Sequence, residues 1–177
     1  MKLRRLLIAA CCAGALAATG CATKPVDDDG TPWTSGRLSL RVDASPERPS
    51  ISLTAGFELR GSGQRGELRL LSPIGTQHAA ARWAPGIATL ITAEGTRQFQ
   101  GLDELSREAL GEPLPLAALP DWLRGKPWPE APAVVSSAGF EQLGWSVSLA
   151  RVADGFVEAR RSAAPSVQLR VQLDRGD

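Results

Sequence analysis

Residues 51–60 read Ile-Ser-Leu-Thr-Ala-Gly-Phe-Glu-Leu-Arg. Apolar and polar side chains alternate along this stretch, and a period of two is typical of a β-strand with one face on a core and the other in water. The same alternation recurs in residues 37–42, 145–149 and 167–174. Glycine- and proline-containing turns separate these stretches at short intervals, which predicts a mainly β fold of antiparallel strands, curved or closed into a barrel or half-barrel.

Two short segments depart from this alternation. Residues 102–110 carry apolar side chains at helical spacing and end at Gly111, which predicts a short amphipathic helix with a glycine stop. Residues 116–123 are a second helical candidate: Pro115 could open the helix, or Pro120 could move its start further along the chain. We expect both helices to pack across the open mouth of the curved sheet.

Composition excludes several classes of function. The chain has 177 residues, one domain of ordinary size, and 20 Lys and Arg against 19 Asp and Glu, which argues against a nucleic-acid binder. All three cysteines fall within the first 21 residues and His78 is the only histidine, so we expect no metal site and no enzyme activity. The Gly-x-Gly-x-x-Gly pattern of residues 61–66 leads into a strand-like stretch, so it predicts a hairpin turn and not a nucleotide site.

The N-terminus has the organisation of an export signal. A basic start is followed by an apolar run of roughly 13 residues, too short to cross a bilayer as a helix. Small residues then lead to Cys21, which resembles a bacterial lipobox whose cysteine becomes lipidated; an ordinary secretory signal with an incidental cysteine is the alternative. Residues 22–32 are polar and rich in proline and aspartate, which predicts a solvated tether.

A turn with an apolar tip is the most informative candidate site. Pro73 and Gly75 bracket the bulky Ile74 between two predicted strands. Turn tips normally carry polar side chains because they face water. Ile74 therefore either folds back onto the core or enters an apolar phase, and composition leaves both possibilities open.

The aromatic side chains also allow two interpretations. Five tryptophans and four phenylalanines are dispersed along the chain. They either fill a solid core or line an apolar cavity beneath the helices.

Taken in order, the motifs resemble the family of the outer-membrane lipoprotein receptor LolB over essentially the whole chain. The motifs are the lipobox at Cys21, Trp-Thr-Ser-Gly-Arg-Leu at 33–38, Phe-Glu-Leu at 57–59, Leu-Leu-Ser-Pro-Ile-Gly at 70–75, Gly-Glu-Pro-Leu-Pro-Leu at 111–116, Leu-Pro-Asp-Trp-Leu-Arg-Gly-Lys-Pro at 119–127, Gln-Leu-Gly-Trp at 142–145 and the strand 167–173.

The resemblance implies an incomplete antiparallel β-barrel covered by a lid of short α-helices. It divides the chain into a lipoprotein signal peptide (1–20), a lipidated N-terminus with its tether (21–32) and a half-barrel lipid-binding domain (33–177). The chain ends without the further strand and tryptophan that family members often have, which leaves the closure of the barrel open.

The resemblance also implies the function. A receptor of this family accepts lipoproteins from the periplasmic carrier LolA in an apolar cavity and inserts them into the outer membrane. Cys21 would carry a diacylglycerol and an N-acyl chain and no other cofactor, and the chain would face the periplasm as a monomer. Ile74 would be the bulky aliphatic residue of the membrane-insertion loop Pro73–Gly75, and the expected cavity wall comprises Phe57, Leu59, Leu70, Trp83, Leu90, Trp122 and Trp145. The alternative is a structural lipoprotein that scaffolds an outer-membrane complex with a solid β-core.

Overall fold

The computed structural model describes residues 30–175. The predicted signal peptide, the lipidation site at Cys21 and most of the predicted tether lie outside the described residues.

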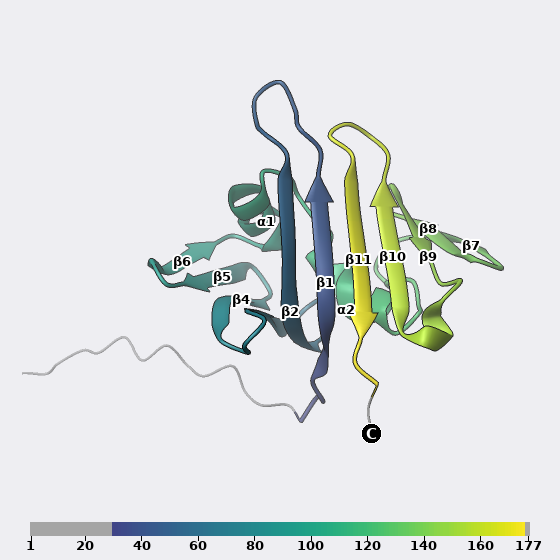
Figure 1. Cartoon of the computed structure of the whole chain (residues 1–177), viewed down its shortest axis with the longest axis horizontal. Coiled ribbons are helices and arrows are strands. Elements are labelled where there is room, and N and C mark those ends of the chain that lie inside the picture. The colour runs from purple at the N-terminus through teal and green to yellow at the C-terminus, as the bar shows by residue number, and fades with distance from the viewer. Residues whose placement is uncertain (1–29, 176–177) are drawn as a thin grey trace, which may run out of the picture.

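Eleven antiparallel strands and two short α-helices make up the described chain (Figure 1). This confirms the mainly β class. In chain order the elements are β1 (Thr34–Val42), β2 (Ile51–Gly61), β3 (Gly66–Leu71), β4 (Gln77–Ala84), β5 (Ile87–Thr92), β6 (Gly95–Phe99), α1 (Leu102–Leu110), the 3₁₀ turn η1 (Leu116–Ala118), α2 (Leu119–Leu123), β7 (Ala133–Ser136), β8 (Gly139–Gln142), β9 (Trp145–Ser148), the 3₁₀ turn η2 (Val152–Asp154), β10 (Phe156–Arg161) and β11 (Val167–Leu173).

All eleven strands form one sheet in the order β6-β5-β4-β3-β2-β1-β11-β10-β9-β8-β7. All strands that are neighbours in sequence pair with each other except β6 and β7. One further pairing joins β11 to β1, from Gly36 opposite Leu173 to Val42 opposite Val167. The last strand is therefore central. The sheet stays open because β6 and β7 are its two edges, so the prediction of an incomplete barrel is confirmed.

The helices owe their position to this topology. After β6 the chain stands at one edge of the sheet, and β7 begins the opposite edge. Residues 100–132 therefore cross the open side between the edges, and they carry both helices there (Figure 1). Leu105, Trp122 and Leu123 pack into the same apolar core as the inward side chains of the strands. The expected helical lid is confirmed.

Local sequence explains where each helix begins and ends. Gly111 adopts a left-handed backbone, φ 78°, and its N–H donates to the Arg107 carbonyl, which ends α1 as predicted. The second segment splits into η1 and α2, and Pro120 lies in the first turn of α2, where its missing N–H costs no helical hydrogen bond.

The face of the sheet turned away from the helices, which we call the outer face, carries a buried carboxylate. Glu67 on β3 is only 1% exposed. Its two oxygens lie 2.9 Å from Arg69, 3.2 Å from Arg82 and 3.2 Å from Arg60. Burial by itself raises the pKa of Glu67, but the hydrogen bond from Arg69 and the charges of Arg82 and Arg69 outweigh it and hold the pKa below the ordinary value of 4.5.

Substitution of this carboxylate is expected to weaken the fold in a pH-dependent way. The unfolded chain binds the Glu67 proton at a higher pH than the folded chain, so the stabilisation exists above pH 4.5 and is lost as the pH falls through the lower folded-state pKa. Glu67→Gln should cost about 2–3 kcal/mol at pH 7, because three partly exposed guanidinium groups lose their shared counter-charge. Urea unfolding at pH 7 and pH 3 checks this: the deficit should shrink in acid, and an equal deficit at both values would contradict it.

Within residues 30–175 no helix is long and apolar enough to span a membrane.

Candidate functional site

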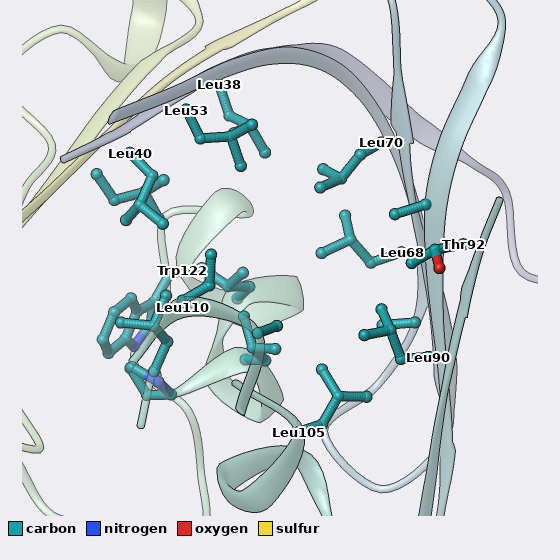
Figure 2. A pocket seen from close by; sticks show the side chains of 18 of the residues that line it. Leu38, Leu40, Leu53, Leu68, Leu70, Leu90, Thr92, Leu105, Leu110 and Trp122 are labelled. Atoms are coloured by element: carbon teal, nitrogen blue, oxygen red, sulfur yellow. The ribbon is translucent and has the colours of Figure 1, made fainter. Parts of the chain in front are cut away.

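An apolar cavity of about 310 Å³ lies between the inner face of the sheet and the helices (Figure 2). Strands β1 to β5 supply one wall and the segment from α1 to α2 supplies the roof. Nineteen residues line it, and twelve are leucine: Leu38, Leu40, Leu53, Leu68, Leu70, Ala79, Ala81, Leu90, Thr92, Leu105, Ala109, Leu110, Leu114, Pro115, Leu116, Leu119, Trp122, Trp145 and Leu169.

The chemistry of this wall selects a hydrocarbon. No lining residue is charged, and Thr92 carries the only hydroxyl. Water gains few hydrogen bonds in such a space, whereas methylene groups gain close contact with leucine side chains. The leucines labelled in Figure 2 point toward a common hollow from the strands and from α1. The cavity therefore suits an aliphatic chain.

The structure places the seven aromatic and leucine residues of the expected wall in two groups. Leu70, Leu90, Trp122 and Trp145 line the cavity. Phe57, Leu59 and Trp83 are buried in the core but do not border the cavity.

The second group is held away from the hollow by local packing. The Phe57 ring lies over Gly36, toward the start of β1. The Trp83 indole N–H donates to the Ser62 carbonyl at 2.9 Å, which pins the ring at the β2–β3 hairpin. The alternation places these three residues on the correct, inner face of the sheet, but it does not show how far along each strand the cavity extends.

The sequence interpretation missed most of the leucine lining. Leu38, Leu40 and Leu53 lie on inner-face positions of the predicted strands, and Leu105 and Leu110 lie on the predicted helix. Period-two and helical spacing together identify these positions, whereas the predicted wall favours the dispersed aromatic residues.

A buried glutamine fastens the roof. Gln142 on β8 is 2% exposed, and its side-chain oxygen accepts from the Trp122 indole N–H and the Trp128 backbone N–H, both at 2.8 Å. Its amide nitrogen donates to the carbonyls of Trp128 and Ala131, both at 2.7 Å. Trp122 also packs against Trp145, with ring centroids 6.1 Å apart. These contacts attach α2 and the proline-rich segment after it to the sheet.

Replacing this glutamine is expected to loosen the roof. Gln142→Leu removes the glutamine partner of the buried Trp122 indole N–H and of three part-buried backbone groups, and we expect a loss of about 2–3 kcal/mol of unfolding free energy. Gln98→Leu, at an exposed position of β6, is the matched control and should change stability by less than about 0.5 kcal/mol. Urea denaturation of both variants measures the difference; equal midpoints would contradict the role of Gln142.

The turn between β3 and β4 presents Ile74 to the outside. The Gly75 N–H donates to the Ser72 carbonyl at 2.9 Å, and the Thr76 N–H donates to the Ser72 hydroxyl at 3.0 Å. Gly75 has φ 82°, which favours glycine. Ile74 is 89% exposed, the highest value among the large apolar side chains of the described chain. It does not fold back onto the core.

Residues 30–175 contain no group of three or more His, Cys, Asp or Glu placed to hold a metal ion.

Comparison with known proteins agrees with these features. Residues 33–175 match the family model described as "Outer membrane lipoprotein LolB". The outer-membrane lipoprotein LolB of Bordetella petrii is 38% identical over 148 residues, covering 76% of this chain and 73% of the relative. That of Chromobacterium violaceum is 37% identical over 122 residues, covering 68% and 64%. That of Ralstonia nicotianae is 32% identical over 147 residues, covering 79% and 68%.

Proposed function

Since the chain belongs to the LolB family of outer membrane lipoproteins, we propose that it receives lipoproteins from the periplasmic carrier LolA and inserts them into the outer membrane. The observation that carries the proposal is the leucine-lined cavity, since acyl chains are the only part of a lipoprotein that such a wall favours. No covalent bond changes in this transfer, so the chain acts as a receptor and needs no catalytic group.

The cavity can hold more acyl chains than its closed volume allows if part of the roof, the segment from α1 to α2, moves outward. About 310 Å³ lies at the lower end of the range of roughly 300–1000 Å³ found for small-molecule pockets. A client with two or three acyl chains therefore requires an outward shift of one helix.

The contacts of the two helices indicate which one moves. Helix α2 is held by Gln142 and by the contact between the rings of Trp122 and Trp145, which are tilted by 55°. In contrast, the polar link between α1 and the strands is the ion pair between Arg97 and Glu108, 2.9 Å apart with both side chains more than half exposed, and the other contacts of α1 with the sheet are apolar, centred on the buried Leu105. Exposed pairs contribute less than about 1 kcal/mol, and an acyl chain can replace the apolar contacts, so we expect α1 to be the part of the roof that opens.

The remaining features fit delivery to a membrane. Cys21, acylated with diacylglycerol and an N-acyl chain, would anchor the protein, and Ala22 in place of Asp agrees with sorting to the outer membrane. Ile74 would enter the inner leaflet of that membrane and ease the exit of the acyl chains. Transfer requires no nucleotide if the bilayer holds the chains more tightly than the cavity, since about 1.4 kcal/mol gives a tenfold preference. We expect the protein to act as a monomer.

Binding of a fluorescent fatty acid tests the proposal. The mature chain should bind the probe saturably with one class of site and in competition with palmitate. A structural lipoprotein with a solid β-core, the alternative function, should show no saturable binding. Absence of saturation at micromolar probe, with the protein folded by circular dichroism, would contradict the receptor function.

A further inference from the structure

The outer face beside the Ile74 turn carries a cluster of arginines around one tryptophan. The registers of β1, β2 and β3 align Arg37 with Gly56 and Leu71, the last residue before the turn. Strands lie about 4.8 Å apart, so Arg37 stands about 10 Å from Leu71. Arg37 and Leu71 point outward because their neighbours Leu38 and Leu70 line the cavity on the other face.

The adjacent rows continue this surface. Arg69 stands opposite Glu58 on one side and Ala80 on the other, and Arg82 stands opposite Glu67. The Trp33 ring lies over the guanidinium groups of Arg69 and Arg60, at 4.2 and 4.6 Å from its centroid. Trp33 remains 36% exposed. Tryptophan with arginine is the combination that favours the headgroup region of a bilayer.

The charge of this surface is positive after its internal pairs are counted. Among residues 30–175, four arginines, 37, 60, 69 and 82, stand in the same rows as three carboxylates, 58, 67 and 174, which leaves a net charge of +1. Arg82 contacts Glu67 through Nε, and its terminal amino groups make no hydrogen bond to residues 30–175. Arg37 is exposed and makes no ion pair within the same described range. Both can therefore bind an external anion.

The lipid anchor would bring this surface to the membrane. Trp33 lies 12 residues after Cys21, so the connecting chain reaches at most roughly 43 Å. The contacts of Trp33 with Arg60 and Arg69 show that the chain enters the domain on the outer face, which also carries Arg37 and borders the Ile74 turn. An anchored domain can present both to the bilayer that holds its own acyl chains.

We propose that Trp33, Arg37 and Arg82 bind the headgroup region of an anionic bilayer, the two arginines through its phosphates, and hold the Ile74 turn against that membrane; this rests on the membrane contact of Ile74 in the proposed function. The headgroup surface, named here by those three residues, gives the domain a fixed orientation on the membrane. Ile74 supplies the apolar contact, and the arginines supply a contact that depends on lipid charge and on salt.

Vesicle binding tests this inference directly. The mature chain with Cys21→Ser, which lacks the acyl anchor, is sedimented with vesicles of phosphatidylethanolamine containing 30% phosphatidylglycerol or with vesicles of phosphatidylcholine alone. Arg37→Gln/Arg82→Gln should bind the anionic vesicles about tenfold more weakly and the neutral vesicles unchanged. Arg107→Gln/Arg151→Gln removes the same charge from α1 and from the segment before η2, and should have less than a twofold effect.

Single and apolar variants separate the possible outcomes. Arg37→Gln alone breaks no ion pair of the described chain and should give about a threefold loss, which excludes unfolding as the cause. Ile74→Glu should weaken binding to both vesicle types. If Ile74→Glu binds normally while Arg37→Gln/Arg82→Gln binds anionic vesicles more weakly, the insertion role of Ile74 is wrong and the headgroup surface is still supported. If Arg37→Gln/Arg82→Gln binds anionic vesicles as tightly as the parent, the inference is overturned. If the same variant is impaired only in accepting lipoprotein from the carrier, the inference is also overturned, and the surface would instead bind an acidic protein.

Discussion

Replacement of Ile74 by glutamate is expected to lower the rate of lipoprotein delivery to vesicles at least tenfold while leaving acceptance from the carrier intact. The side chain is 89% exposed and the turn around it is closed by its own hydrogen bonds, so the substitution disturbs no packing. A carboxylate entering hydrocarbon costs several kcal/mol more than an isoleucine. Transfer of a carrier-bound, radiolabelled lipoprotein to liposomes measures delivery, and co-purification with the client measures acceptance.

Two controls make this result specific. Ile74→Leu keeps the apolar volume and should deliver normally. Val134→Glu introduces the same charge at another exposed apolar position, on the edge strand β7 with 72% exposure, and should also deliver normally. Normal delivery by Ile74→Glu, or an equal defect in Val134→Glu, would contradict a specific insertion role for the turn.

Filling the cavity is expected to abolish acceptance. Ala81 on β4 lines the hollow between Leu68 and Leu90, which stand opposite it on the neighbouring strands. Ala81→Phe places a ring where an acyl chain would lie, and probe affinity should fall at least tenfold because a packed interior has no spare volume for both. Fluorescent fatty-acid titration measures the loss.

The matched control lies on the next strand. Thr89→Phe adds the same ring on β5 but on the outer face, since its neighbours Ala88 and Leu90 point inward. It should leave probe affinity within twofold of the parent. Full affinity in Ala81→Phe, with an unchanged melting temperature, would show that the probe binds elsewhere.

Local patterns predicted the strands and the helices well. The alternation of residues 51–60 appears as the inner and outer faces of β2, and the helical spacing of 102–110 appears as α1 with its end at Gly111. These features depend on side chains a few residues apart, which a sequence displays directly. The sequence also predicts the turn at Pro73–Gly75, but it leaves the direction of the Ile74 side chain open, and the 89% exposure of Ile74 emerges only with the structure.

Features built from distant segments were not predictable in this way. The pairing of β11 with β1 joins residues more than 120 positions apart, and Gln142 holds a roof segment 11 to 20 positions before it. Glu67 occupies an outward polar position in the pattern, yet three arginines from three strands bury it. Only the sheet order brings these groups together, so their roles emerge with the tertiary structure.

The presence of an acyl chain inside the leucine-lined cavity is the central claim, and photo-crosslinking of a client tests it most directly. A lipoprotein carrying a diazirine on its acyl chain is loaded onto the mature protein, irradiated, and digested for mass spectrometry. Adducts should map to inner-face and roof residues such as Leu70, Leu90 and Leu110. Adducts confined to the outer face or to Ile74, or their persistence in Ala81→Phe, would contradict it.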